Sequence, residues 1–135
     1  MLCRVKGWKF VNMACIYVLA LRCKGDDTRY YKVGYLNYGD APDRMNYCDR
    51  TNVPLSTYFD LVDYRQWETP RAKEIEDIIH DKIRNEWKWK CDGLKGIHRK
   101  HKFFPRLFSG VTECRVYDSE EVRAVYGCIK EEIGL

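Results

Sequence analysis

Several features that mark other protein classes are missing from this sequence. Its seven cysteines include no C-x-x-C pair, and their number is odd. A disulfide framework uses an even number of cysteines and a standard zinc cluster uses closely spaced pairs, so neither is expected. The cysteines therefore indicate a reducing compartment, and we expect a cytoplasmic protein. No internal repeat and no low-complexity tract is visible either.

The apolar run at residues 10–21 is too short to cross a bilayer. It has about twelve residues, whereas a membrane-spanning helix needs about 20. Arg4, Lys6 and Lys9 precede it as they would in a signal peptide, but no small-x-small cleavage site follows. We therefore expect a buried strand here and no membrane partner.

The composition is that of one globular domain spanning residues 1–135, with 45% hydrophobic and 14% aromatic residues. Residues 1–12 are expected to be an N-terminal extension. The net charge of +4 is mild, but basic residues gather in a predicted loop or insertion at 88–110. This segment is either a solvated loop or a nucleic-acid-binding surface, whose contacts would come from Lys88, Lys90, Lys95, Arg99, Lys100, Lys102 and Arg106.

The first half of the chain predicts three strands and one short helix. Residues 15–22 and 30–36 are extended, apolar runs joined by a turn at 24–27, which predicts a β-hairpin. An acidic N-cap and a proline then favour a helix that carries Arg44 and ends near Asp49. Residues 54–64 are predicted to form a third strand.

The second half predicts two helices and a further strand. After Pro70, apolar residues recur every three or four positions, which is typical of an amphipathic helix. Glu76 and His80 lie four residues apart and so share one flank of this helix, next to its apolar stripe. A strand at 111–117 and a helix from Ser119 to about Glu132 complete an α+β fold.

Five short patterns follow one another in a recognisable order. They are Cys15-Ile16-Tyr17, Lys32-Val33-Gly34, Arg44, an A-x-x-x-E-x-x-x-H helix ending at His80, and a G-x-x-E segment ending at Glu113. This order and spacing resemble the GIY-YIG nuclease superfamily, more closely its viral and phage-associated branch, in which the second motif reads K-[IV]-G. The resemblance covers about residues 13–126.

The resemblance implies a central three-stranded antiparallel sheet flanked by helices, here with an extra C-terminal strand and helix. It implies hydrolysis of DNA with one Mg²⁺ or Mn²⁺, in the host cell cytoplasm if the source is viral. Tyr17 would orient or deprotonate the attacking water. Lys32 and Arg44 would stabilise the phenolate and the charge on the phosphate oxygens.

The same resemblance assigns roles to four further residues. Glu76 would hold the cation, and His80 would help through a hydrogen bond to phosphate or to a metal-bound water. Gly34 and Glu113 match the family pattern as structural or secondary positions. The chain departs from the pattern at Cys15, which replaces a glycine, and at Cys48, where some members have a histidine.

Three functions stay open on the sequence alone. The first is an endonuclease, which could act as a transient homodimer or with a targeting protein. The second is a nucleic-acid-binding module whose catalytic residues have decayed, and the third is a small viral interaction protein that engages a host protein or a nucleotide. Each residue also has a plain structural alternative: Tyr17 could be a core aromatic, and Lys32 could be the solvent-facing member of a half-buried strand.

Overall fold

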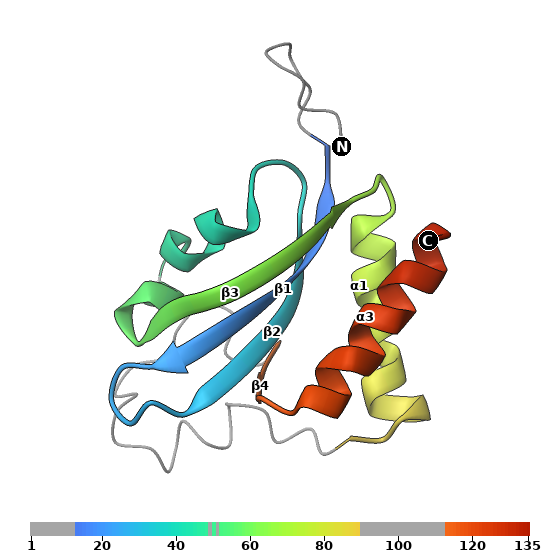
Figure 1. Cartoon of the computed structure of the whole chain (residues 1–135). Coiled ribbons are helices and arrows are strands. Elements are labelled where there is room, and N and C mark those ends of the chain that lie inside the picture. The colour runs from blue at the N-terminus through green and yellow to red at the C-terminus, as the bar shows by residue number, and fades with distance from the viewer. Residues whose placement is uncertain (1–12, 49, 51, 90–112) are drawn as a thin grey trace.

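The structure, a computed structural model, describes residues 13–48, 50, 52–89 and 113–135 (Figure 1). One antiparallel sheet has the strand order β3-β1-β2-β4. The strands are β1 (Cys15–Cys23), β2 (Arg29–Leu36), β3 (Phe59–Glu68) and β4 (Cys114–Val116). With the helices α1 (Ala72–Asp81) and α3 (Ser119–Ile133), they confirm the predicted α+β fold with a C-terminal strand and helix. Among the described residues, no helix has the length and apolar character needed to cross a bilayer.

The hairpin of β1 and β2 forms the centre of the sheet, as predicted. Its register runs from Cys15 opposite Leu36 to Arg22 opposite Arg29. Asp27 adopts a left-handed conformation in the turn, with φ of 63°, which aspartate tolerates better than most residues. The predicted boundaries of both strands agree with the structure to within one residue.

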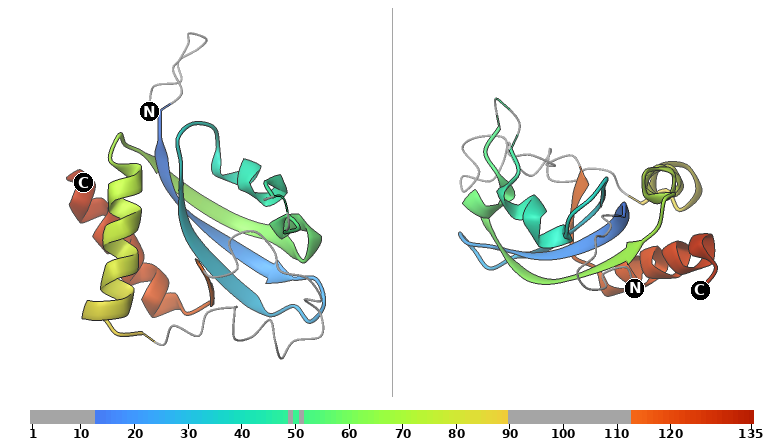
Figure 2. Two further views of the ribbon diagram at one scale, coloured as in Figure 1. Left: turned by 180° about the vertical axis from the view of Figure 1, so that it is seen from behind. Right: turned by 90° about the horizontal axis from the view of Figure 1, so that it is seen from above.

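The sheet separates two clusters of buried side chains because neighbouring residues of a strand point to opposite faces. On one face, Tyr17 and Leu19 of β1 pack beneath the 3₁₀ helix η2 (Ala41–Asn46). On the other face, Ile16 and Val18 pack with the helices α1 and α3. Figure 2 shows η2 and α3 on opposite sides of the sheet.

Two of the predicted boundaries are wrong. The segment predicted as a strand at 54–64 begins with a 3₁₀ turn, η3 (Leu55–Thr57), and its strand runs later, at Phe59–Glu68. The helix predicted to end near Asp49 is the 3₁₀ helix η2, which ends at Asn46. Its N-terminus is fixed by the Asp43 carboxylate, which accepts the Asp40 N–H at 3.3 Å.

β3 lies at an edge of the sheet, and no described strand pairs with its outer side. Val62 and Tyr64 are 42% and 41% exposed there. Charged residues alternate with them at Asp63 and Arg65, which are also exposed. Charges of this kind are typical of edge strands that do not pair with other molecules.

The helix α1 lies beside the part of β2 that β4 does not reach. Among the described residues, β4 pairs with residues 30–32 of β2. Just beyond that pairing, the Val33 carbonyl accepts a hydrogen bond from His80 Nε2 of α1 at 3.2 Å. α1 itself continues into a π-helical turn, η4 (Lys82–Glu86), which the sequence pattern did not predict. The flank that carries Glu76 and His80 therefore meets the sheet beside β2.

Candidate active site

The hydroxyl oxygen of Tyr17 lies between two cationic side chains. Lys32 Nζ, on the neighbouring strand, donates to it at 3.1 Å, and Arg44 Nε, on η2, donates to it at 3.2 Å. The Tyr17 side chain is fully buried. Both lone pairs of the phenol oxygen are thus directed at cations, and its O–H is left to act as a donor.

Lys32 is itself buried, with 2% of its surface exposed. The alternative of a solvent-facing lysine is therefore wrong. Its ammonium forms an ion pair with Glu113 Oε1 at 2.8 Å. Burial works against the charge, but Tyr17 and Glu113 outweigh it and hold the pKa of Lys32 above its ordinary value. Lys32 is consequently a charged residue in the interior of the protein.

Arg44 is held in place by two aromatic residues. Besides its hydrogen bond to Tyr17, its guanidinium carbon lies 4.2 Å from the centre of the Tyr47 ring. Tyr47 follows Arg44 by three positions and directly follows η2, where its backbone N–H donates to the Arg44 carbonyl at 3.3 Å. Sequence reasoning gave Tyr47 no role at the site, although this spacing was a usable signal.

Gly34 explains how the Tyr17 phenol fits into the sheet. Gly34 is the direct partner of Tyr17 across β1 and β2. A Cβ atom on Gly34 would lie 2.6 Å from Tyr17 Cζ and 2.9 Å from Lys32 Nζ, closer than real contacts allow. Only glycine leaves room here for the phenol and the ammonium together.

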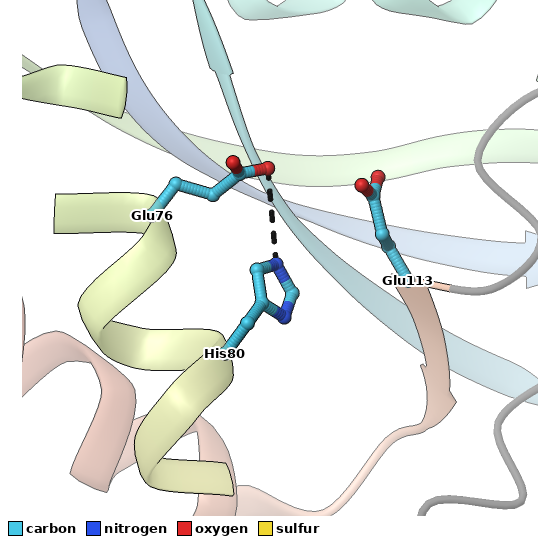
Figure 3. Close-up of side chains that lie close together, drawn as sticks. All are labelled: Glu76, His80 and Glu113. Carbon is cyan, nitrogen blue, oxygen red and sulfur yellow. Dashed lines mark ion pairs between the residues drawn. The ribbon is translucent and has the colours of Figure 1, made fainter. Parts of the chain in front are cut away.

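A second group consists of Glu76, His80 and Glu113 (Figure 3). One potential ligand atom of each residue lies within 4.8 Å of the others. Glu76 and His80 project from α1 toward Glu113, which directly precedes β4. Because Glu113 also contacts Lys32, this acidic group adjoins the Tyr17 group through one ion pair.

His80 acts as a hydrogen-bond donor in this group. Its Nε2 lies 3.2 Å from the Val33 carbonyl oxygen, which can only accept, so the proton is on Nε2. Burial lowers the pKa of His80 below its ordinary value of 6.5, which favours the neutral ring. The contact between His80 Nε2 and Glu76 Oε2 at 3.8 Å is therefore not an ion pair at neutral pH.

The Glu76 carboxylate is the most unusual group of the site. Its side chain is 9% exposed, and no hydrogen bond to it is found among the described residues. Burial and the negative charge of Glu113 raise its pKa to about 7. A buried carboxylate with these properties can bind either a proton or a cation at neutral pH.

The structure thus brings together all five residues that were predicted as catalytic. Glu113, predicted as structural or secondary, lies between the two groups and contacts Lys32 directly. Lys88 is described, with φ of 54°. The predicted N-terminal extension, residues 1–12, lies outside the described residues. The same holds for the other residues of the predicted nucleic-acid-binding segment, which are Lys90, Lys95, Arg99, Lys100, Lys102 and Arg106.

Comparisons with protein-family models, with curated proteins and with solved structures found no match for this chain. A phenol held by two cations, next to a pair of carboxylates, is a set that can activate water and stabilise a phosphate.

Proposed function

We propose that this protein is a metal-dependent endonuclease of the GIY-YIG type, which hydrolyses phosphodiester bonds of DNA with one Mg²⁺ or Mn²⁺. One observation carries the proposal. The Lys32 ammonium contacts both the Tyr17 hydroxyl and the Glu113 carboxylate, at 3.1 Å and 2.8 Å. The groups needed for water activation, charge neutralisation and cation binding therefore share a single location.

Tyr17 is the residue that handles the proton of the attacking water. As a phenolate, stabilised by Lys32 and Arg44, it takes a proton from water, and the resulting hydroxide attacks the phosphorus atom. The bond to the leaving oxygen breaks as the new P–O bond forms. Because the two donors already point at the Tyr17 oxygen, the phenolate needs no rearrangement of the site.

Arg44 and Lys32 also neutralise the scissile phosphate. Arg44 uses Nε for Tyr17, and the remaining N–H groups of its planar guanidinium match the geometry of phosphate oxygens. The Tyr47 ring limits the orientations of that plane.

Glu76 would hold the cation, which supplies Lewis-acid stabilisation of the phosphate and the leaving oxygen when bound. The properties of Glu76 support this role, since it is buried and has no hydrogen bond among the described residues. His80 supports Glu76 by fixing α1 against the Val33 carbonyl. Cutting both strands with one such site would need two successive nicks or a transient dimer.

Plasmid cleavage tests the proposal. Purified protein should nick supercoiled DNA with Mg²⁺ or Mn²⁺ and should be inactive in EDTA. Tyr17→Phe and Glu76→Gln should each lower the rate by about 10²-fold or more, since each removes a group used in the transition state. Asp77→Asn is the matched control, because Asp77 neighbours Glu76 on α1 but pairs outward with Lys73 at 2.8 Å.

Two results would contradict this function. One is wild-type protein that never nicks the plasmid, and the other is cleavage that persists equally in both active-site variants. Salt-sensitive DNA binding without cleavage would instead indicate a nucleic-acid-binding module.

A further inference from the structure

We infer that Glu113 is a second protein ligand of the divalent cation, and that Lys32 holds this carboxylate until the cation binds. The inference rests on the proposed function for the identity of the cation. It goes beyond that function because Glu113 becomes part of the binding site and because cation binding becomes coupled to the Lys32–Tyr17 pair.

The distances between the carboxylates suit a single ion. The potential ligand atoms of Glu76, His80 and Glu113 lie within 4.8 Å of one another. Two oxygens bound to the same Mg²⁺ at about 2.1 Å are about 3 to 4 Å apart. Rotation of the two glutamate side chains by a small amount is therefore enough to bind one ion between α1 and the start of β4.

The surroundings of Glu76 are an independent sign of a ligand. More than nine tenths of its side chain is buried, and the His80 ring nitrogen Nε2 lies 3.8 Å from Glu76 Oε2. That ring donates its Nε2 proton to Val33 instead. An ionised carboxylate in such a position is costly unless a cation or a hydrogen-bond donor satisfies it.

The type of cation follows from the ligands that remain. With its proton on Nε2, His80 has no lone pair directed at Glu76. Two carboxylate oxygens, completed by water and by substrate phosphate, form a site for a hard ion. The site therefore favours Mg²⁺ and Mn²⁺ over Zn²⁺, which prefers nitrogen and sulfur ligands.

Lys32 provides the positive charge that neutralises Glu113 before the cation binds. Its ammonium lies 2.8 Å from Glu113 Oε1, so the ammonium and a divalent ion compete for the same carboxylate. When Glu113 turns to the ion, Lys32 keeps its hydrogen bond to Tyr17. The positive charge that Glu113 had neutralised then acts on the phenol oxygen and on the substrate. Cation binding at the two glutamates thus strengthens the positive charge that Lys32 directs at Tyr17 and the substrate.

Mn²⁺ binding to the full chain without nucleic acid tests this directly, by calorimetry or by electron paramagnetic resonance. Glu113→Gln should weaken binding by at least about tenfold, and Glu76→Gln should weaken it by as much or more. His80→Gln should change the affinity by less than about threefold, because a glutamine amide can still donate to Val33. Glu120→Gln is the matched control, since this exposed glutamate lies in the first turn of α3 and should leave binding unchanged.

Lys32→Met tests the competition. Removing the ammonium should tighten Mn²⁺ binding, and unchanged or weaker binding would overturn the idea that Lys32 competes for Glu113. A thermal melt of each variant must show a cooperative transition. If Glu113→Gln binds Mn²⁺ like the wild type, Glu113 is not a ligand.

The outcomes separate this inference from the proposed nuclease. Loss of Mn²⁺ binding in Glu113→Gln, together with a wild type that never cuts DNA, would support the two-glutamate site and reject the nuclease. Cleavage by the wild type, with the same Mn²⁺ dependence in Glu113→Gln, would support the nuclease and reject Glu113 as a ligand.

Discussion

The ring of Tyr17 lies over Gly34, its direct partner in the antiparallel pairing of β1 and β2. The missing side chain of Gly34 is what lets the phenol reach both Lys32 and Arg44. Tyr17 and Gly34 belong to different sequence motifs, so neither motif alone shows that the two residues touch. The register of the hairpin places them opposite each other. The position of the reactive oxygen is therefore set by a glycine and a strand register together.

Gly34→Ala should abolish most of the activity without unfolding the protein. The added methyl group would displace the Tyr17 ring and the Lys32 ammonium, because its carbon would lie 2.6 Å and 2.9 Å from their atoms. Overpacking of this kind costs about 1–3 kcal/mol of stability. We expect the cleavage rate to fall by about 10²-fold, because small displacements of catalytic groups have large effects.

The control for this change is Gly127→Ala in α3, where a Cβ would meet no atom within 4 Å. Alanine there should leave the rate unchanged and stabilise the helix by up to about 1 kcal/mol. Equal rates for Gly34→Ala and the wild type would show that the phenol does not depend on this glycine.

A double-mutant cycle should reveal strong coupling between Tyr17 and Lys32. Tyr17→Phe removes the acceptor of the Lys32 and Arg44 hydrogen bonds, and Lys32→Met removes one of the two donors. Each change should destabilise the protein by about 1–3 kcal/mol, since a buried partner is left unsatisfied. In urea unfolding, the double variant should be more stable than the sum of the two losses predicts, by about 0.5–3 kcal/mol. Strict additivity would mean that the two side chains act independently.

Glu76 should make the cation-free protein less stable as the pH rises. Burial raises the pKa of Glu76 from 4.5 to about 7, so the folded state retains a proton that the unfolded chain releases. This contribution to stability is present in full below about pH 4.5 and is lost as the pH rises through about 7. Glu76→Gln should therefore be more stable than the wild type at pH 8 in EDTA, by about 1–3 kcal/mol.

The difference between Glu76→Gln and the wild type should shrink at pH 5, where the folded wild type carries a neutral Glu76. Urea unfolding at the two pH values measures this change. Addition of Mn²⁺ at pH 8 should stabilise the wild type but not the variant. A Glu76→Gln variant that is less stable than the wild type at pH 8 in EDTA would contradict the raised pKa of Glu76.

His80 should matter for stability more than for cation binding. His80→Ala removes the hydrogen bond to the Val33 carbonyl and should cost about 1–2 kcal/mol in thermal or urea unfolding. His80→Gln should recover much of that loss, because its amide can donate to the same oxygen. If both variants lose Mn²⁺ binding equally, His80 is a ligand and its tautomer differs from the one that the Val33 contact indicates.

Local patterns were sufficient for the hairpin and for α1. The turn at 24–27 and the apolar spacing after Pro70 each act over a few residues, so the sequence predicts both elements closely. The spacing of Glu76 and His80 on one flank follows from the helix alone. The edge strand β3 was misplaced because residues 62–65 are exposed on both faces, which removes the alternation of a half-buried strand.

The burial of Lys32 and the role of Glu113 could not be read from local patterns. A lysine in an alternating strand suggests a solvent-facing side chain, but η2 and its neighbours cover that face of β2. Glu113 reaches Lys32 only because β4 pairs with residues 30–32, which are about eighty positions earlier in the chain. Such long-range pairing leaves no periodic signal around Glu113, and the family resemblance alone gave it a structural or secondary role.

The charges along β3 bear on how the molecule behaves when it is concentrated. A ten-residue strand without a described partner on its outer side can recruit a strand from another copy and start a fibre. Self-pairing in antiparallel fashion centred on Asp63 or on Arg65 would set two identical charges opposite each other. Repulsion at these two positions opposes polymerisation in those registers.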